Sequence, residues 1–544
     1  MISFNMKKIL ILLFCIFNVL YSGAQEQQTP NRDIPYSYQF YQKLNQSIYN
    51  VNSKVHSSIR GFYSDDTTLV NGYTILMNAG VDSLTKRSWA RRKLMEEHLL
   101  NFDDDDYNVY IDFLPDLQIG RDFKDKKTTW LNTRGFQIGG NVGSKFSFYA
   151  SAYENQAVFS NYYNTFVEKN LVVPGQAQGN KINSGKSDYN YATALISYTP
   201  NKHLNLTLGR DKNFIGDGYR SMLLSDNSAP YSFFRIRASL GSIHYQTIYA
   251  YMLDPGAERF TEDRRLGDRG KWMAAHYVDW NVTKRFSAGF FQAVTWADAE
   301  VEGKRGFDFN YAHPFIFLRS VESANSVSPD KMRLGFNLKY EIFNNTTIYG
   351  QFMFDEFTAK EFFAGTGYWA NKNAIQIGVR GADLMKVKRL NYLAEFNTAR
   401  PYTYAHFNRI SNYSSMNQPL ANQLGANFRE FLGLLNYSLK RFDFSAEAMY
   451  ARTGLDPQGL NYGGDIFKSY DVRVSEYGNK IGQGLGTDLY YGEAKVAYIL
   501  NPKYNLRIEL GGIFRKESNA LSVTNTGLFT LGLRSTFRNL YTDF

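Results

Sequence analysis

The stretch MRLGFNLKYEIF, residues 332–343, alternates apolar and polar side chains. A β-strand turns successive side chains to opposite faces, so this period of two predicts one apolar and one polar face. The apolar face carries Met332, Leu334, Phe336, Leu338, Tyr340 and Ile342, and the opposite face carries Arg333, Asn337, Lys339 and Glu341.

Similar runs fill the chain from about Tyr107 to Phe544, and we count about 18 of them. Because lipid offers no partner to an open sheet edge, such strands must close on themselves. The predicted fold class is all-β: a transmembrane antiparallel β-barrel of about 18 strands with a small N-terminal periplasmic helical element. Short connections fall at 240–242, 343–345 and 501–502, and they alternate with long ones such as 156–189, 213–232 and 401–427.

The alternation also assigns side chains to the lipid and to the lumen. A lumen that holds both signs of charge fits either a water-filled pore or a plugged interior crossed by ion pairs. The final strand is predicted over Leu528 to Phe544, with an aromatic last residue as is usual for such barrels. The predicted lipid face includes Phe234, Ile236, Ala238, Phe442, Phe444, Ala446, Ala448, Tyr504, Leu506, Ile508 and Leu510, and the lumen face includes Arg235, Arg237, Asp443, Glu447, Asn505, Arg507 and Glu509.

The N-terminus has the pattern of a signal peptide. Lys7 and Lys8 precede an apolar run, and Ser22-Gly23-Ala24 supplies small residues for cleavage. We therefore expect residues 1–24 to be removed. Cys15, the single cysteine, lies inside this segment; bulky Phe14 before it disfavours lipidation, so disulfides and thiol catalysis are excluded from the mature chain.

Residues 25–106 differ from the rest and are predicted to form a periplasmic helical segment, followed by the outer-membrane barrel over residues 107–544. One apolar stripe predicts a helix, and a second helix is expected over Thr85 to Leu100. The stripe consists of Tyr41, Leu44, Ile48, Val51 and Val55. A flexible leader with transient helicity is the alternative.

The composition indicates which kinds of molecule the protein contacts. The net charge is +10, and 40 Tyr and 42 Phe accompany only 6 Trp, an excess that aromatic girdles at two membrane interfaces would explain. For a secreted chain, a basic balance favours outer-membrane lipid, lipopolysaccharide or acidic glycans over nucleic acid.

Signals for catalysis or metal binding are weak. The acidic run Asp103–Asp106 lacks the spaced ligands and the turn glycine of a calcium loop, and a solvated hinge is the default interpretation. None of the seven histidines lies in a G-x-S-x-G or H-E-x-x-H context. We expect no catalytic residue, no metal and no cofactor.

The most distinctive stretch runs from Gly209 to Pro230. Its Gly, Asp, Asn and Ser residues favour an ordered turn, but Leu223 and Leu224 in its middle require burial. We therefore predict that this connection folds inward and constricts the lumen.

This stretch, the segment Asn310 to Arg319, Tyr349-Gly350-Gln351 with Asp355-Glu356, and Gly425-Ala426-Asn427-Phe428 resemble the capsule assembly Wzi family, most closely its gliding-associated RemB-like branch. The resemblance implies an 18-stranded outer-membrane barrel with a periplasmic helical bundle, a blocked lumen and a lectin-like role without chemistry. Ile215 stands where the family usually has a tryptophan.

The resulting functional hypothesis is a non-enzymatic barrel that binds or anchors exported capsular polysaccharide at the cell surface. The alternatives are an adhesion or gliding-motility platform with protein partners and, third, a porin. We expect the N-terminal segment and the C-terminus to be periplasmic and the long loops extracellular. The candidate ligand-binding residues are Arg210, Asp211, Asp217, Tyr219, Arg220, Ser225, Asn227, Arg319, Tyr402 and Tyr404, and further loop groups suited to sugars are Tyr162, Tyr163, Arg259, Arg264, Arg265, Arg269, Asn412 and Tyr413.

Overall fold

The computed structural model describes residues 37–61, 67–81, 87–178, 181–183, 185–260, 267–313 and 330–544. The predicted signal peptide, Arg264, Arg265 and Arg319 lie outside the described residues. Within the described part of the chain, no helix has the length and apolarity needed to cross a membrane.

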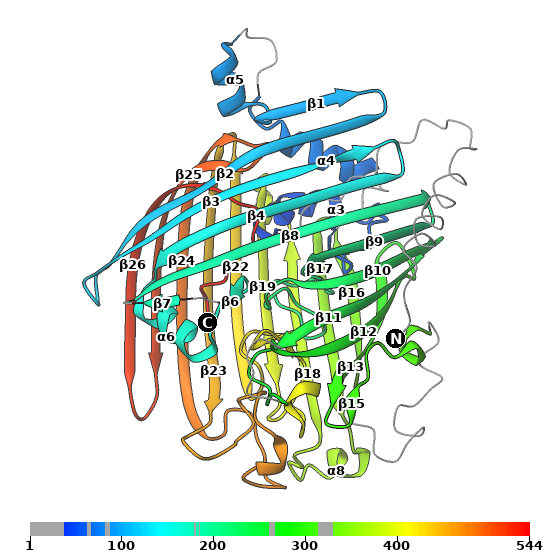
Figure 1. The fold of residues 1–544 in the computed structure, drawn as a ribbon, viewed down its shortest axis with the longest axis vertical. Coiled ribbons are helices and arrows are strands. Elements are labelled where there is room, and N and C mark those ends of the chain that lie inside the picture. The colour runs from blue at the N-terminus through cyan, green and yellow to red at the C-terminus, as the bar shows by residue number, and fades with distance from the viewer. Residues whose placement is uncertain are drawn as a thin grey trace.

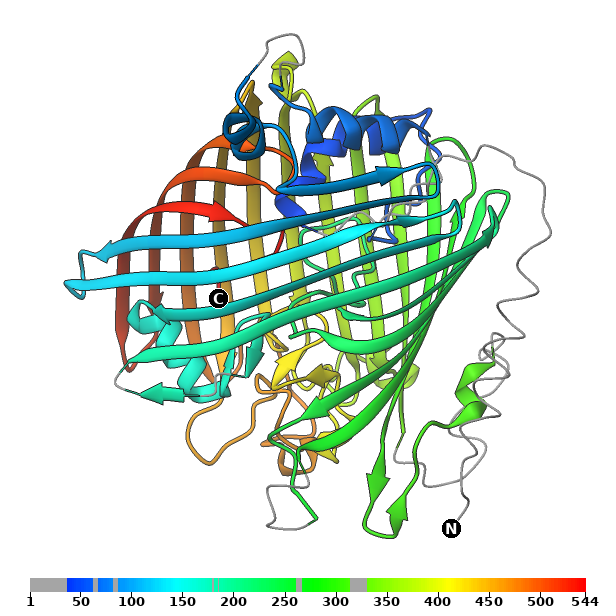
Figure 2. The ribbon, with the colours of Figure 1, turned by 45° about the horizontal axis from the view of Figure 1, so that its top comes forward.

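Eighteen long antiparallel strands form one closed barrel, as predicted (Figures 1 and 2). Neighbours in the barrel follow chain order, and β2 pairs with β26 to close it. The strands are β2 (Tyr107–Asp122), β3 (Lys127–Val142), β4 (Phe146–Val158), β8 (Lys186–Asn201), β9 (Leu204–Asp211), β10 (Tyr231–Leu240), β11 (Ile243–Asp254), β12 (Arg269–Asn281), β13 (Phe286–Ala297), β16 (Lys331–Phe343), β17 (Thr346–Glu356), β18 (Lys372–Gly381), β19 (Leu390–Ala399), β22 (Phe428–Leu439), β23 (Phe442–Leu455), β24 (Leu485–Asn501), β25 (Leu506–Ser518) and β26 (Val523–Ser535).

The closing seam uses only part of β2. Residues Asp116 to Asp122 pair with β26, whereas the first residues of β2 pair with β1 (Leu100–Asp104), a short strand that the alternation did not predict. Asp105 and Asp106 turn between β1 and β2, so the acidic run is the exposed turn of a hairpin.

The barrel exterior is apolar at strand after strand. On β16, Phe336, Leu338 and Tyr340 are 41%, 48% and 45% exposed, while Arg333 and Asn337 are buried in the lumen. This alternation is the one expected for a barrel wall in lipid. The assignment was wrong for Tyr504 and Leu506, which are buried, because β25 begins only at Leu506 and Tyr504 lies in the preceding turn.

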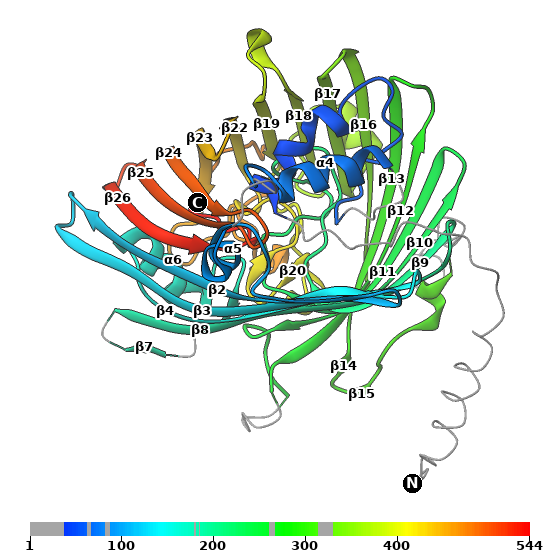
Figure 3. The same cartoon turned by 90° about the horizontal axis from the view of Figure 1, so that it is seen from above.

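Short helices occupy one mouth of the barrel, the mouth where the short turns lie. The segment α2 (Tyr38–Tyr41), η1 (Gln42–Leu44) and α3 (Asn45–Ile48) packs against α4 (Thr67–Met77). Seen from above, α4 lies across this mouth (Figure 3). Contacts to the short turns include Gln46 to Asp383, Asn78 to Lys503 and Gly80 to Arg441.

The helices differ in length from the prediction. The first helical run ends at Ile48, since Tyr49 leaves helical backbone angles, although Val55 still joins the same apolar cluster. The second helix, α5 (Trp89–Met95), is shorter than predicted because Leu100 already belongs to β1. The helix α4 was not predicted.

Short helices and strands lie within the long connections. They are β5 (Val172–Val173), β6 (Ala177–Gln178), β7 (Lys181–Asn183), α6 (Asn161–Asn170), β14 (Ala299–Glu300), β15 (Gly303–Lys304), η3 (Phe309–Ala312), α8 (Ala359–Phe363), η6 (Arg409–Ser411), β20 (Ser414–Ser415), β21 (Gln418–Pro419) and η7 (Tyr470–Val472), with η5 (Leu384–Lys386) in a short turn.

The C-terminus is not a strand end. The last strand stops at Ser535, and Thr536–Phe544 turns into the lumen, where Figure 1 places the C-terminus. Phe537 packs with the short helices at one end, whereas Phe544 packs on Tyr163 and Phe166 of α6 in a long connection. The prediction of a final strand reaching Phe544 was therefore wrong: the tail crosses the interior, and an extended chain of nine residues spans about 30 Å.

Candidate functional site

The connection between β9 and β10 forms an internal plug. Met222, Leu223 and Leu224 are fully buried and pack against lumen residues such as Met353. Ile215 bridges both Ile59 of the N-terminal segment and Leu224. The inward fold predicted for this stretch is what the structure has.

Gly216 allows the backbone of the plug to lie very close to the barrel wall. Gly216 has φ +144°, and a Cβ at this position would collide with the side-chain amide of Gln351. The same amide accepts from the backbone N–H of Met222 at 2.7 Å and donates to the carbonyl of Ile215 at 3.1 Å. Gln351 thus fixes the plug to β17.

Arg220 is the electrostatic centre of the plug. Its guanidinium is fully buried and donates to Glu430 Oε1 at 3.0 and 3.1 Å, and it also pairs with Asp543 of the tail. Burial opposes ionisation of Asp543, but Arg220 and hydrogen bonds hold the pKa of that carboxyl below its usual value. Arg220 therefore ties the plug to both the wall and the tail.

Asp217 anchors the plug to the N-terminal helices. Its carboxylate accepts from Tyr49 at 3.2 Å, Ser57 at 2.6 Å and Asn337 at 3.0 Å. Burial alone would raise the pKa of Asp217, but Lys339 and these hydrogen bonds outweigh it and lower that pKa.

A second inward connection, residues 400–427, packs on the plug. Tyr404 donates its hydroxyl to the carbonyl of Met222 at 2.8 Å, and Tyr413 donates to that of Leu223 at 2.7 Å. Tyr402 is buried and donates to Asn461 at 2.9 Å. These three tyrosines are therefore hydrogen-bonded inside the barrel and are not exposed to solvent.

Most of the remaining candidate residues also contact other parts of the protein. Arg210 lies on the exposed outer face of β9, whereas Asp211 faces inward and accepts from the backbone N–H of Lys212. Asn227 donates to the carbonyl of Ala421, and Ser225 is buried with its backbone N–H bonded to Leu420. Tyr219 is half-buried between Tyr38 and Tyr541.

The loop groups expected to face sugars are mostly engaged as well. Asn412 and Tyr413 are buried, and Tyr163 is 6% exposed. Arg259 pairs with Asp268 at 2.6 Å, and Arg269 stacks on Phe260.

A cluster of aromatic rings, two of them exposed, two half-buried and one buried, lies elsewhere at the long-loop mouth. We define the outer aromatic patch as Tyr368, Trp369, Phe407, Tyr470 and Tyr477, which lie on three different long connections. Tyr477 is 50% and Phe407 44% exposed, and Arg473 stacks over Trp369 at 4.3 Å. Sequence analysis missed this patch because its members are separated by up to 109 positions and follow no motif.

Two histidines are oriented by buried carboxylates. His98 Nδ1 lies 2.6 Å from Asp112, and His56 Nδ1 lies 2.6 Å from Asp279. In the part of the chain that the structure describes, neither imidazole hydrogen-bonds a serine or threonine hydroxyl, and no group of three or more His, Cys, Asp or Glu is arranged to hold a metal ion.

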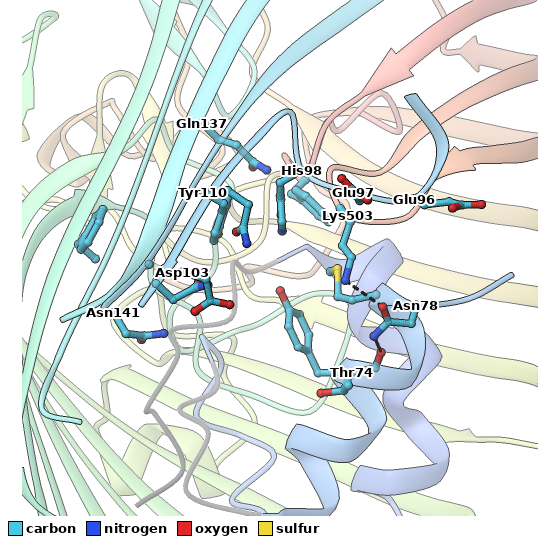
Figure 4. A pocket seen from close by; sticks show the side chains of 17 residues that line it. Thr74, Asn78, Glu96, Glu97, His98, Asp103, Tyr110, Gln137, Asn141 and Lys503 are labelled. Carbon is cyan, nitrogen blue, oxygen red and sulfur yellow. Dashed lines mark hydrogen bonds between the residues drawn. The ribbon is translucent and has the colours of Figure 1, made fainter. Parts of the chain in front are cut away.

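A pocket of about 470 Å³ opens at the short-turn mouth (Figure 4). One wall is α4, with Thr74 and Asn78, and the other is the β1–β3 sheet. Sheet residues that line it include Asn101, Asp103, Asn108, Tyr110, Gln137 and Asn141, and His98 and Lys503 close one end.

No protein-family model and no curated protein matches the chain. Among solved structures, the chain is similar to Wzi of Escherichia coli, an outer-membrane protein involved in group 1 capsule assembly and described as a carbohydrate-binding β-barrel; the TM-score is 0.54 with 11% identity over 93% of this chain and 100% of that chain. Pseudomonas aeruginosa OprD and OccD3 both give a TM-score of 0.41, with 10% and 11% identity over 83% and 84% of this chain and 98% of each of theirs. The first likeness is one of fold: the chain has a Wzi-like outer-membrane β-barrel fold.

Proposed function

We propose that the protein is a non-enzymatic outer-membrane barrel that binds exported polysaccharide with its long loops and holds it at the cell surface. One observation carries the proposal: folded, hydrogen-bonded chain fills the lumen. The plug, the 400–427 connection and the tail meet in the interior through Arg220, Asp543 and Tyr404. A barrel closed in this way acts through its surface and not through a diffusion path.

The outer aromatic patch is the surface that we assign to the glycan. The exposed ring of Tyr477 and the half-buried ring of Tyr368 each combine a flat apolar face, on which the C–H face of a sugar can pack, with a hydroxyl for its polar groups. Arg473 adds a cation beside Trp369 for an acidic sugar. Rigid strands position the three loops, as is common for binding surfaces built from loops.

The orientation follows from this assignment. The long loops would face the medium, and the helices at the short-turn mouth would face the periplasm. We place the C-terminus inside the barrel, because Asp543 pairs with Arg220 and Phe544 packs on α6. The exterior apolar side chains would contact lipid and lipopolysaccharide. Membership of the gliding-associated branch stays a prediction.

The test is the division of surface polysaccharide between cells and medium. Deleting the gene is expected to leave total polysaccharide unchanged and move it into the medium. Tyr368→Ala with Tyr477→Ala should reproduce the release, while Phe123→Ala, which removes a more exposed ring in the β2–β3 turn, should not. An unchanged division in the deletion strain would overturn polysaccharide anchoring and favour the adhesion or gliding platform, which co-purification of a protein partner would then test.

A further inference from the structure

The pocket at the short-turn mouth combines amides, rings and few free charges. Asn101, Asn108 and Asp103 have no side-chain hydrogen bond to any other described residue, so their polar atoms are available to a ligand. The pocket volume of about 470 Å³ lies within the range of about 300–1,000 Å³ that is usual for small-molecule sites.

A stacked pair of rings, Tyr110 and His98, is built into the β2 side of the pocket. The Tyr110 ring lies on Gly139, where a Cβ would collide with it, and His98 stacks on the same ring at 4.2 Å between centroids. Glycine at this position lets the ring lie flat against β3.

A buried carboxylate fixes the histidine of this pair. Asp112 is fully buried and accepts from the His98 Nδ1–H at 2.6 Å, from the Leu99 N–H at 2.8 Å and from Gln137 at 2.9 Å. A histidine that donates through Nδ1 leaves Nε2 as the free ring nitrogen. His98 therefore adds an oriented polar group to the amides of the pocket.

The charges that line the pocket give an anionic ligand no net attraction. Glu97 pairs with Lys93 at 3.0 Å and with Arg92 at 3.3 Å, and Glu96 pairs with Arg87. Lys503 at the closed end donates to Asn78 at 2.9 Å, and Asp103 faces it across the pocket (Figure 4). Because Glu96 and Glu97 are compensated by these cations, a phosphate or a uronate would meet one lysine and the carboxylate of Asp103, whereas hydroxyl and amide groups would find donors and acceptors on both walls.

We infer that this pocket binds a short stretch of neutral or amino-sugar glycan at the short-turn mouth, separate from the outer aromatic patch. Two sources supply such a glycan: the exported polysaccharide as it passes the barrel, and the amino-sugar strands of the cell wall. The pocket as a glycan site does not depend on the proposed function, because it lies at the opposite mouth; only the exported polysaccharide as its source rests on that function.

The experiment titrates full-length protein in detergent by isothermal calorimetry with three probes. These are tetra-N-acetylchitotetraose, neutral fragments of the host strain's own surface polysaccharide, and tetragalacturonate. We expect saturable binding of at least one of the first two, and the probe that binds more tightly identifies the source. Asn101→Ala with Asn108→Ala should weaken this binding at least tenfold, while Asn525→Ala, an exposed strand amide at the opposite end, should leave it unchanged.

Variants separate this site from the outer one. Tyr368→Ala with Tyr477→Ala should retain binding of the pocket probe even where it releases polysaccharide from cells. With the outer site removed by Tyr368→Ala and Tyr477→Ala, the inference is overturned if neither of the first two probes binds, if tetragalacturonate binds more tightly than both, or if adding Asn101→Ala and Asn108→Ala leaves binding unchanged.

Discussion

Replacing Arg220 by alanine is expected to destabilise the closed barrel strongly. The guanidinium is fully buried and faces two carboxylates, Glu430 and Asp543, so the variant leaves two buried acidic groups without their cation. Breaking a buried ion pair in this way costs about 3–5 kcal/mol.

The groups around Arg220 place the loss in free energy of unfolding near the lower end of that range. Glu430 keeps two donors after the change, Asn397 at 2.9 Å and Asn422 at 2.9 Å. Asp543 loses the cation that lowers its pKa. We therefore expect Arg220→Ala to lower the free energy of unfolding by about 3 kcal/mol.

The assay is equilibrium unfolding in detergent, read by tryptophan fluorescence, for wild type, Arg220→Ala, Asp543→Ala and the double variant. Because the two residues interact directly, the double variant should cost less than the sum of the singles by about 1–3 kcal/mol. Arg121→Ala is the matched control, since Arg121 is exposed and should change stability by less than about 0.5 kcal/mol.

Two results would refute this reasoning. A loss below about 1 kcal/mol for Arg220→Ala would mean that water solvates the guanidinium. Additive effects of the two single changes would mean that the tail does not reach the plug in the folded protein.

Three further predictions concern the tail, the plug and the wall. Deleting Thr536–Phe544 should raise conductance in planar bilayers above the closed wild-type level; equal conductance would show that the tail does not help to seal the lumen. The lowered pKa of Asp217 means that its stabilisation is present above the usual carboxyl pKa of about 4 and is lost as the pH falls below it, so acid titration of unfolding from pH 5 to pH 2 should destabilise the wild type more than Asp217→Asn. Parallel acid curves would contradict the Asp217 contacts. Leu338→Arg on the lipid face should cost about 2–4 kcal/mol in the same unfolding assay, and a neutral effect would argue against a bilayer at that height.

Local sequence was sufficient for the barrel wall. Strands such as Lys331–Phe343 bury every second side chain against the lumen, and the period of two is visible wherever one face is apolar. The inward plug was predictable because Leu223 and Leu224 had no apolar surroundings in an external loop.

The tail was missed although a signal exists. Beyond Ser535 the alternation fails, since Asn539 and Asp543 fall on positions that should face lipid. The aromatic Phe544 masked this, because an aromatic last residue is also typical of a final wall strand.

The candidate site was predictable only in part. Arg220 and Tyr404 were selected as polar loop residues, but a polar side chain in a loop can serve a buried network as well as a ligand, and burial depends on distant partners such as Glu430. The short-turn pocket joins α4, β1–β3 and Lys503, which no local pattern connects.

The most direct test of the account is binding of the purified barrel to the host strain's purified surface polysaccharide by surface plasmon resonance. We expect saturable binding by the wild type, at least a tenfold loss in Tyr368→Ala with Tyr477→Ala, and retained binding in Phe123→Ala. No binding by the wild type, or equal binding by the double tyrosine variant, would contradict a polysaccharide site at the long-loop mouth.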